Sequence, residues 1–266
     1  MRSQLQLGLV VEGNSTDSAV LRLPNLAEEL GPVKSSALRV ARRLCNFLHA
    51  GYAITDYQDL QAARLVLLRV PDVSVSRIVD ELCGAELVFK ELSFVLCESW
   101  LTSDVLEPLR ARGASVATLI AARTSRRKWF VTEGGVAAVR QARKLIERND
   151  ARVLELRPGA KHLYFAADLL ATALPQPLLL AAQQSLRLSG MSGKHLHGLL
   201  DELGEQMFKT FLRGARGRWG GPLTECPPET VQAYLEALRG KHADIAELID
   251  KELPVAVQRM GGGAVP

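Results

Sequence analysis

Three polar residues stand together where an apolar strand is expected to end. Cys97, Glu98 and Ser99 directly follow the apolar stretch Ser93–Leu96. A carboxylate in a dry site can have its pKa raised until it transfers protons, so Glu98 is a candidate acid or base. The alternative is a structural acid bonded to a neighbouring helix start. No histidine lies near Cys97 in the sequence, so we expect a buried, inert thiol there.

A second group of polar side chains repeats at helical spacing. Lys161, Tyr164 and Asp168 are three and four residues apart, which places them on one face of a helix. Lysine and tyrosine can protonate or orient a carbonyl or imine oxygen. A Tyr–Asp contact beside a solvated lysine is the plainer alternative. His195 and His197 are two residues apart and face away from each other on a helix, so we expect no metal site.

The turn after the first expected strand is a third candidate. Gly13-Asn14-Ser15-Thr16 follows the strand Gln6–Glu12, and hydroxyls and amides at a helix start can hold a phosphate. Glycine, asparagine, serine and threonine are also the ordinary residues of turns and N-caps. The turn is therefore either a phosphate site or a simple helix entry.

The elements that position these residues alternate between strands and helices. The run Arg64–Asp72 (RLVLLRVPD) is apolar up to Pro71-Asp72, which is typical of a strand buried on both faces, and a helical pattern follows it. Repeated strand–helix units predict a parallel sheet, in which ligands lie beyond the carboxyl ends of the strands where the strand order reverses. We expect Pro71 and Asp72 to form one wall of that site.

The remaining pattern predicts about six strands and then helices only. Residues 19–34 are expected to be an irregular detour with one helical turn. Further strands are expected at 52–57, at 87–89 with 93–96, and at 115–121, 129–132 and 152–156. Helices are expected at 35–50, 104–112, 136–147, 160–190 (kinked near its prolines), 193–213, 228–239 and 244–251.

Composition places the chain among soluble, internal proteins. Residues 1–158 are expected to form an α/β domain, 159–260 an all-α domain and 261–266 a disordered tail. Four scattered cysteines suit the reducing cytoplasm, and no apolar run suggests a signal peptide or a membrane span. A net charge of +4 is small for 266 residues, so nucleic acid is not the expected partner.

Several stretches resemble a known superfamily. The chain is similar to dehydrogenases and reductases that join a Rossmann domain to a helical domain of the 6-phosphogluconate-dehydrogenase type, such as 3-hydroxyisobutyrate dehydrogenase, pyrroline-5-carboxylate reductase and ketopantoate reductase. An uncharacterised Rossmann-like branch of that group resembles it most. The resemblance rests on RLVLLRVPD, LCES, DVLEPLRARGASVATL, WFVTEG, AKHLYFAADLLATAL and GPLTECPPETVQAYLEAL.

The resemblance implies a cofactor, NAD or NADP, and a site between the two domains. The turn at Pro71-Asp72 would lie against this cofactor, and the strand end with Cys97 and Ser99 would face the nicotinamide. Asp168 would face the substrate from the long helix. The loop before the helix at 228 would contribute Thr224 and Glu225, unless these form only a helix-entry turn. Many relatives dimerise through the helical domain, so we expect a homodimer.

The expected glycine fingerprint of these families is missing. Counted back from Gly51, its three glycines fall on Ser35, Ala37 and Val40. Asp56 lies about 20 residues further on, where an acid would bind a ribose hydroxyl and favour NADH over NADPH; a solvated strand-end acid is the alternative. The sequence thus favours an NAD(P)-dependent oxidoreductase acting on a small carbonyl, imine or hydroxyacid. A ligand-sensing or assembly module without turnover is the second hypothesis.

Overall fold

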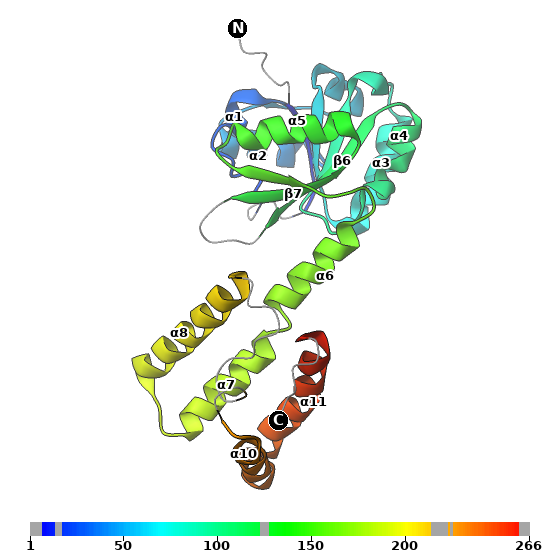
Figure 1. Cartoon of the computed structure of the whole chain (residues 1–266). Coiled ribbons are helices and arrows are strands. Elements are labelled where there is room, and N and C mark those ends of the chain that lie inside the picture. The colour runs from blue at the N-terminus through cyan, green and yellow to red at the C-terminus, as the bar shows by residue number, and fades with distance from the viewer. Residues whose placement is uncertain (1–6, 14–17, 123–127, 214–222, 224–225, 261–266) are drawn as a thin grey trace. The chain divides into compact units, whose positions relative to one another are not determined.

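Eight strands form one sheet in the order β3-β2-β1-β4-β5-β6-β7-β8 (Figure 1). The computed structural model describes residues 7–13, 18–122, 128–213, 223 and 226–260. Neighbouring strands run parallel except β6 and β7, which are antiparallel. The strands are β1 (Leu7–Val11), β2 (Leu30–Ser35), β3 (Tyr52–Ala53), β4 (Leu65–Arg69), β5 (Ser93–Cys97), β6 (Ser115–Ala122), β7 (Trp129–Gly134) and β8 (Arg152–Glu155).

The strand order reverses between β1 and β4. Leu7 pairs with Leu65 and Val11 with Arg69, so the two strands end side by side. The chain builds β2 and β3 on one side of this pair and β5 to β8 on the other. The prediction of a mostly parallel α/β sheet with β4 at its centre is confirmed, and the reversal lies where such folds bind ligands.

Helices cover both faces of the sheet. Leu65 and Leu67 of β4 pack in one hydrophobic cluster with residues of α2 and α5, whereas Val66 and Leu68 pack in the other with α3 and α4. This alternation follows from the two-residue period of a strand. Figure 1 shows α5 lying along one face. The helices are α1 (Leu26–Glu29), α2 (Leu38–Leu48), α3 (Val75–Gly84), α4 (Glu107–Ala111) and α5 (Val136–Glu147).

The segment before α2 differs from the prediction. The expected helical turn is present as α1, but a strand, β2, follows it at the end of the expected detour, and α2 begins at Leu38 rather than at residue 35. The sequence of β2 does not show a clear strand pattern, because it contains Pro32 and only a short apolar run. Pairing with β1 and β3 stabilises the strand. The stretch 52–57, which was predicted as the second strand, therefore contains the third strand, β3. Asp56 thus follows the third strand and not the second. Ser35 ends β2, Ala37 precedes α2 and Val40 lies within α2, so placing the glycine fingerprint of the first turn on them is wrong.

Four other boundaries also differ. Residues 87–89 do not form a strand, because Phe89–Glu91 is a short 3-10 helix before β5. The expected helix at 104–112 is a 3-10 turn, Ser103–Leu106, followed by α4 with Pro108 in its first turn. The long helix is two helices, α6 (Lys161–Thr172) and α7 (Gln176–Leu188), and the last helix continues to Met260.

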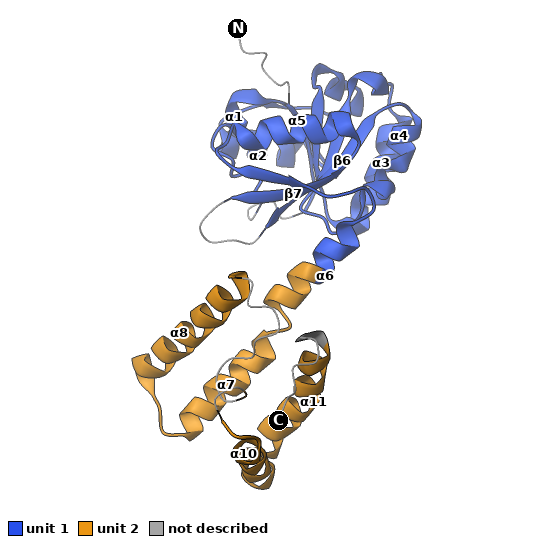
Figure 2. Cartoon of the chain, in the orientation of Figure 1, with its two compact units in different colours: residues 1–166 blue, residues 167–266 orange. Residues whose placement is uncertain are grey.

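The helices after β8 lie mostly in a second unit. The chain divides into residues 1–166 and 167–266, and the division falls within α6 (Figure 2). In the described part of the second unit, the buried apolar residues are only Leu196, Ile245 and Ala246. The segment Lys161–Leu188 is long and apolar enough to cross a membrane by composition alone, although residues 173–175 interrupt it. These helices are α6 (Lys161–Thr172), α7 (Gln176–Leu188), α8 (Gly193–Leu212), α10 (Pro228–Lys241) and α11 (Ala243–Met260).

Candidate functional site

The turns after β1 and β4 meet at the point where the strand order reverses. Gly13 has a φ of +71°, and a Cβ atom placed on it would lie 3.1 Å from Cγ of Pro71. A residue with a side chain would therefore be both strained and crowded there. The structure thus brings together Gly13 and Pro71, two predicted site residues. Asn14, Ser15, Thr16, Thr224 and Glu225 lie outside the described residues.

The Glu98 carboxylate lies at the end of β5, and both of its oxygens have partners. Oε1 accepts hydrogen bonds from the Ser18 hydroxyl at 2.9 Å and from the Val20 N–H at 3.1 Å. Oε2 forms an ion pair with Nε of Arg69 at 2.6 Å. Sequence reasoning did not find Ser18 or Arg69. Arg69 ends β4 beside the turn already assigned to the site, so its position was the available signal.

The backbone at Glu98 is held in an unusual conformation. Its φ is +58°, in the left-handed region that residues with a side chain rarely adopt. Its N–H donates a hydrogen bond to the Leu119 carbonyl of β6 at 2.7 Å. Outliers of this kind persist where surrounding contacts enforce them, often near functional sites.

Lys161 is buried at the start of α6. Its side chain is fully packed, with 2% of the residue exposed, and Nζ donates to the backbone carbonyls of Ser99, at 2.7 Å, and Leu101. Burial lowers the pKa of Lys161 to about 8, although the charges of Glu133 and Asp72 oppose this shift. An ammonium group has three donors, so one N–H remains beyond the two bonds found among the described residues.

Glu133 is a buried acid that the sequence did not single out. It lies in β7 with 1% of the residue exposed, and its carboxylate accepts the N–H groups of Ser103 at 2.7 Å and Gly159 at 3.3 Å. It is also the largest charge acting in favour of protonated Lys161. An acid in the otherwise apolar strand WFVTEG was the signal that could have indicated it.

Two aromatic residues of α6, the helix that Lys161 begins, contact Trp100. Tyr164 stacks on Trp100 with 5.8 Å between ring centroids, and Phe165 meets Trp100 edge-on at 5.2 Å. Tyr164 therefore packs against the loop after β5. Asp168 is partly exposed and belongs to the second unit.

Cys97 and Ser99 are buried beside Glu98. The Cys97 thiol is fully buried, which raises its pKa, and its Sγ contacts the Val95 carbonyl at 3.4 Å. A thiol with a raised pKa is a poor nucleophile, in agreement with an inert side chain. The Ser99 hydroxyl accepts the N–H of Leu101 at 3.0 Å and so holds the loop that Lys161 binds.

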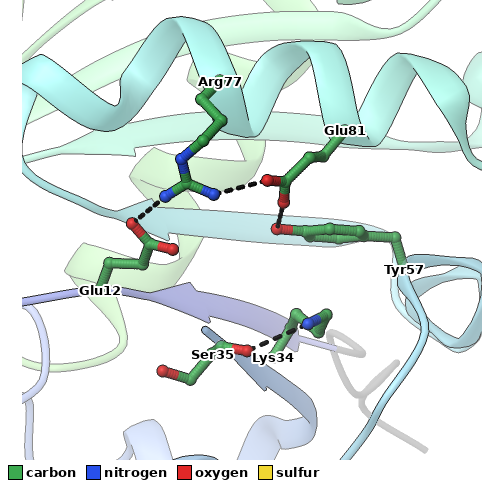
Figure 3. Close-up of polar contacts among 6 residues, drawn as sticks. All are labelled: Glu12, Lys34, Ser35, Tyr57, Arg77 and Glu81. Atoms are coloured by element: carbon green, nitrogen blue, oxygen red, sulfur yellow. Dashed lines mark hydrogen bonds and ion pairs between the residues drawn. The ribbon is translucent and has the colours of Figure 1, made fainter. Parts of the chain in front are cut away.

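A second polar cluster lies at the ends of β1 and β2 (Figure 3). Arg77 of α3 forms ion pairs with Glu12 and Glu81, both at 2.5 Å. The Tyr57 hydroxyl donates to Glu81 at 2.8 Å, and Nζ of Lys34 lies 4.9 Å from the centre of the Tyr57 ring. Glu12 immediately follows β1, where the first fingerprint glycine stands in a dinucleotide-binding fold, and Arg77 balances its charge.

The connection from β2 to α2 has the features of an anion site. The Ser35 hydroxyl is buried and has no hydrogen-bond partner among the described residues. The N-cap residue of α2 is Ala37, which makes no side-chain capping hydrogen bond, and the first turn of α2 carries Arg39 and no acid. The free N–H groups of a helix start, a hydroxyl and a guanidinium together suit a phosphate group. Asp56 lies elsewhere, exposed after β3, with the Thr55 hydroxyl 2.9 Å from its carboxylate.

These features define a doubly wound Rossmann-type unit followed by helices, which is the fold that the resemblance implied. No family model matches the chain, and no curated protein does. Among solved structures, an imine reductase from Aspergillus terreus in complex with NADPH4 and dibenz[c,e]azepine is similar, with a TM-score of 0.71, 15% identity, and coverage of 99% of this chain and 96% of that one.

Two further reductases have the same fold over nearly their whole length. A reductive aminase from Aspergillus terreus in complex with NADPH and ethyl-5-oxohexanoate has a TM-score of 0.67 and 16% identity over 99% of this chain and 97% of that one. A pyrroline-5-carboxylate reductase from Coxiella burnetii has a TM-score of 0.59 and 14% identity over 97% of each chain. At these identities the likeness establishes the fold, which confirms the suspected branch at that level.

Proposed function

We propose that this protein is an NADP-dependent oxidoreductase acting on a small carbonyl, imine or hydroxyacid. The observation that carries the proposal is the buried Ser35 hydroxyl beside the uncapped start of α2, with Arg39 in the first turn. The end of the second strand is where Rossmann folds distinguish the two cofactors, by an acid for NAD or a basic residue for NADP. The β2 end carries no acid, so of the two cofactors left open by the sequence, NAD and NADP, we propose NADP.

The residues present fit such a cofactor at one end of the site and less well at the other. Ser35, Ser36 and Arg39 offer hydroxyls and a positive charge to a phosphate. At the end of β1, Glu12 stands where backbone amides approach the pyrophosphate, and its charge is offset by Arg77. A bound dinucleotide would supply or accept the hydride, which no protein side chain can do.

Lys161 is the proposed proton-handling group. Its pKa of about 8 is close to the range in which a lysine can both hold and release a proton near neutral pH. Glu98 suits this role less well because both of its oxygens already have partners. Tyr164 and Asp168 remain proposed contacts on the same helix, and Pro71, Asp72, Cys97 and Ser99 remain proposed neighbours of the cofactor, as do Thr224 and Glu225 for the substrate.

Nucleotide titration tests the proposal. We expect saturable, micromolar-range binding of NADPH and weaker binding of NADH. Binding is measured by tryptophan fluorescence, because Trp100 lies in the loop after β5. Arg39→Glu should weaken NADPH binding by about 10- to 100-fold, because a charge-assisted hydrogen bond becomes a repulsion. Arg43→Glu makes the same charge change further along α2 and is the matched control. Equal losses in both variants would contradict a specific phosphate site.

A second candidate function rests on Glu12. An acid in place of the first fingerprint glycine, already paired with Arg77, disfavours a pyrophosphate. The chain would then be a ligand-sensing or assembly module that has kept the fold without turnover. Failure of both nucleotides to bind at millimolar concentration would favour this candidate.

We also propose a homodimer formed through the helices, in the cytoplasm. The second unit buries few apolar residues, while α8 exposes a set of large ones at helical spacing. Light scattering during gel filtration should give about twice the monomer mass, and replacing Phe208 and Phe211 by serine should shift the protein towards monomer. A wild-type monomer at micromolar concentration would contradict the proposal. The exposed α8 residues are Leu203, Met207, Phe208, Phe211 and Leu212.

A further inference from the structure

Among the described residues between the first turn and α1, which are 18–25, none forms the helix that a dinucleotide fold normally has there. In such folds the first strand leads through a glycine turn directly into a helix whose amides face the pyrophosphate. Here the next helix, α1, has four residues and begins only at Leu26. Ser18 is nevertheless fully buried, as are Val20 and Leu21. Something other than helical hydrogen bonds must therefore fix residues 18–21.

Glu98 supplies the missing hydrogen-bond acceptors. Its Oε1 accepts from the Ser18 hydroxyl and from the Val20 N–H, at 2.9 and 3.1 Å. The Ser18 oxygen then accepts the N–H of Leu21 at 3.2 Å. One carboxylate oxygen and one hydroxyl thus satisfy two backbone N–H groups that would otherwise be buried without partners, which is costly.

Glu98 is itself fixed from two other strands, its carboxylate from β4 and its backbone from β6. Arg69 of β4 holds Oε2, and the Arg69 carbonyl accepts the N–H of Glu12 at 3.1 Å. The left-handed backbone at Glu98 is anchored to β6 through Leu119. The segment 18–21 is therefore connected to the ends of β4 and β5 through the Glu98 side chain, and the Glu98 backbone is bound in turn to β6.

We propose that Glu98 is a positioning residue, whose carboxylate fixes residues 18–21 at the carboxyl edge where the strand order reverses and so shapes the nucleotide site. The part of the inference that concerns the nucleotide rests on the proposed function. The part that concerns the tether, by which we mean the bonds from Glu98 to residues 18–21, does not. It differs from the sequence-based hypothesis, in which Glu98 transfers a proton. A tether needs an oxygen acceptor, whereas proton transfer needs an ionisable group, and glutamine retains only the first.

Hydrogen–deuterium exchange tests the tether without any nucleotide. In Glu98→Ala, the peptide covering residues 18–23 should exchange at least about tenfold faster, because the amides of Val20 and Leu21 lose their fixed acceptors. Peptides from β7 and α5 should be unchanged. Glu86→Ala, an exposed acid after α3, is the matched control and should leave all of these rates unchanged. If Glu98→Ala does not fold, Ser18→Ala removes one of the two donors to Glu98 and the acceptor of the Leu21 N–H, and should speed exchange of Leu21 in the same peptide.

The second arm measures nucleotide binding and turnover. Glu98→Ala should raise the Kd for NADPH about tenfold or more, with Glu98→Gln in between for both exchange and affinity. Loss of turnover in Glu98→Gln at saturating NADPH, with normal exchange, would overturn positioning in favour of proton transfer. Unchanged exchange in Glu98→Ala would overturn the tether. Faster exchange with an unchanged Kd would overturn its role in shaping the site. If wild type binds no nucleotide, the proposed function fails while the exchange result still decides the tether.

Discussion

Two charged clusters lie at the carboxyl edge of the same sheet, and they differ in their access to water. In the cluster of Arg77, Glu12 and Glu81, the arginine side chain is 52% exposed. In the cluster of Lys161 and Glu133, both residues are at most 2% exposed. Exposed ion pairs contribute little to stability because water and salt screen them, whereas a buried charge depends strongly on its partners. Charged residues of similar type should therefore contribute differently to stability in the two clusters.

The comparison also separates the proposed roles of the two sides. The exposed cluster borders the β2–α2 connection, where a charged phosphate from solvent can arrive and be exchanged. The buried cluster holds the loop after β5 and the start of α6 through backbone groups, at Ser99, Leu101, Ser103 and Gly159. Its charges fix a geometry and tune one pKa, which is what a proton-transfer site needs.

Removing the buried acid should have the largest effect. Glu133→Ala leaves the buried N–H of Ser103 and the more exposed N–H of Gly159 without their acceptor, and Lys161 without its main counter-charge. We expect the free energy of unfolding to fall by about 3–5 kcal/mol, measured by urea denaturation. The matched control is Glu81→Ala, which removes an acid from the exposed cluster.

The control should change stability far less than Glu133→Ala does, and its small effect should shrink further in high salt. Equal losses in the two variants would show that burial does not distinguish the clusters. Glu133→Gln should fall between wild type and alanine, because its amide oxygen can accept one of the two N–H groups while the charge is lost.

Sequence reasoning found the fold and part of the site for identifiable reasons. The apolar run in β4 and the period of α5 are local signals, and both elements formed as predicted. β2 was missed because its strand character comes from pairing with β1 rather than from its own residues. That error moved the fingerprint count to Ser35 and placed Asp56 on the wrong strand.

The site was partly predictable because strand ends are visible in the sequence but their partners are not. Glu98, Lys161 and the turn at Pro71 were indicated by position alone. Ser18, a partner of Glu98, is 80 residues away from it in the sequence, and Ser99, a partner of Lys161, is 62 residues away. No local spacing could therefore suggest these pairs. The sequence predicted a strand that ends at residue 132, with Glu133 in the turn after it, and only the burial of Glu133 reveals its importance.

The smaller of the two expected stability effects is a pH dependence of the free energy of unfolding. It arises from Lys161 in the buried cluster. The pKa of Lys161 is about 8 in the folded protein, below the usual lysine value of 10.5, because burial disfavours the charged form. Between these two values the unfolded chain binds more protons than the folded one, so stability contributed by this group rises with pH. Below the folded pKa both states are protonated and the contribution no longer changes.

From about pH 7 to about pH 9.5, the free energy of unfolding of wild type should therefore rise by about 2 kcal/mol relative to Lys161→Met, which has no titrating group there. Urea denaturation of both proteins across this range gives the difference. Lys90→Met, which removes an exposed lysine, is the matched control for the loss of a lysine side chain. A flat difference between wild type and Lys161→Met would mean that Lys161 keeps an ordinary pKa. Its two carbonyl partners and Glu133 would then offset the cost of burial completely, and the two clusters would differ in exposure but not in chemistry.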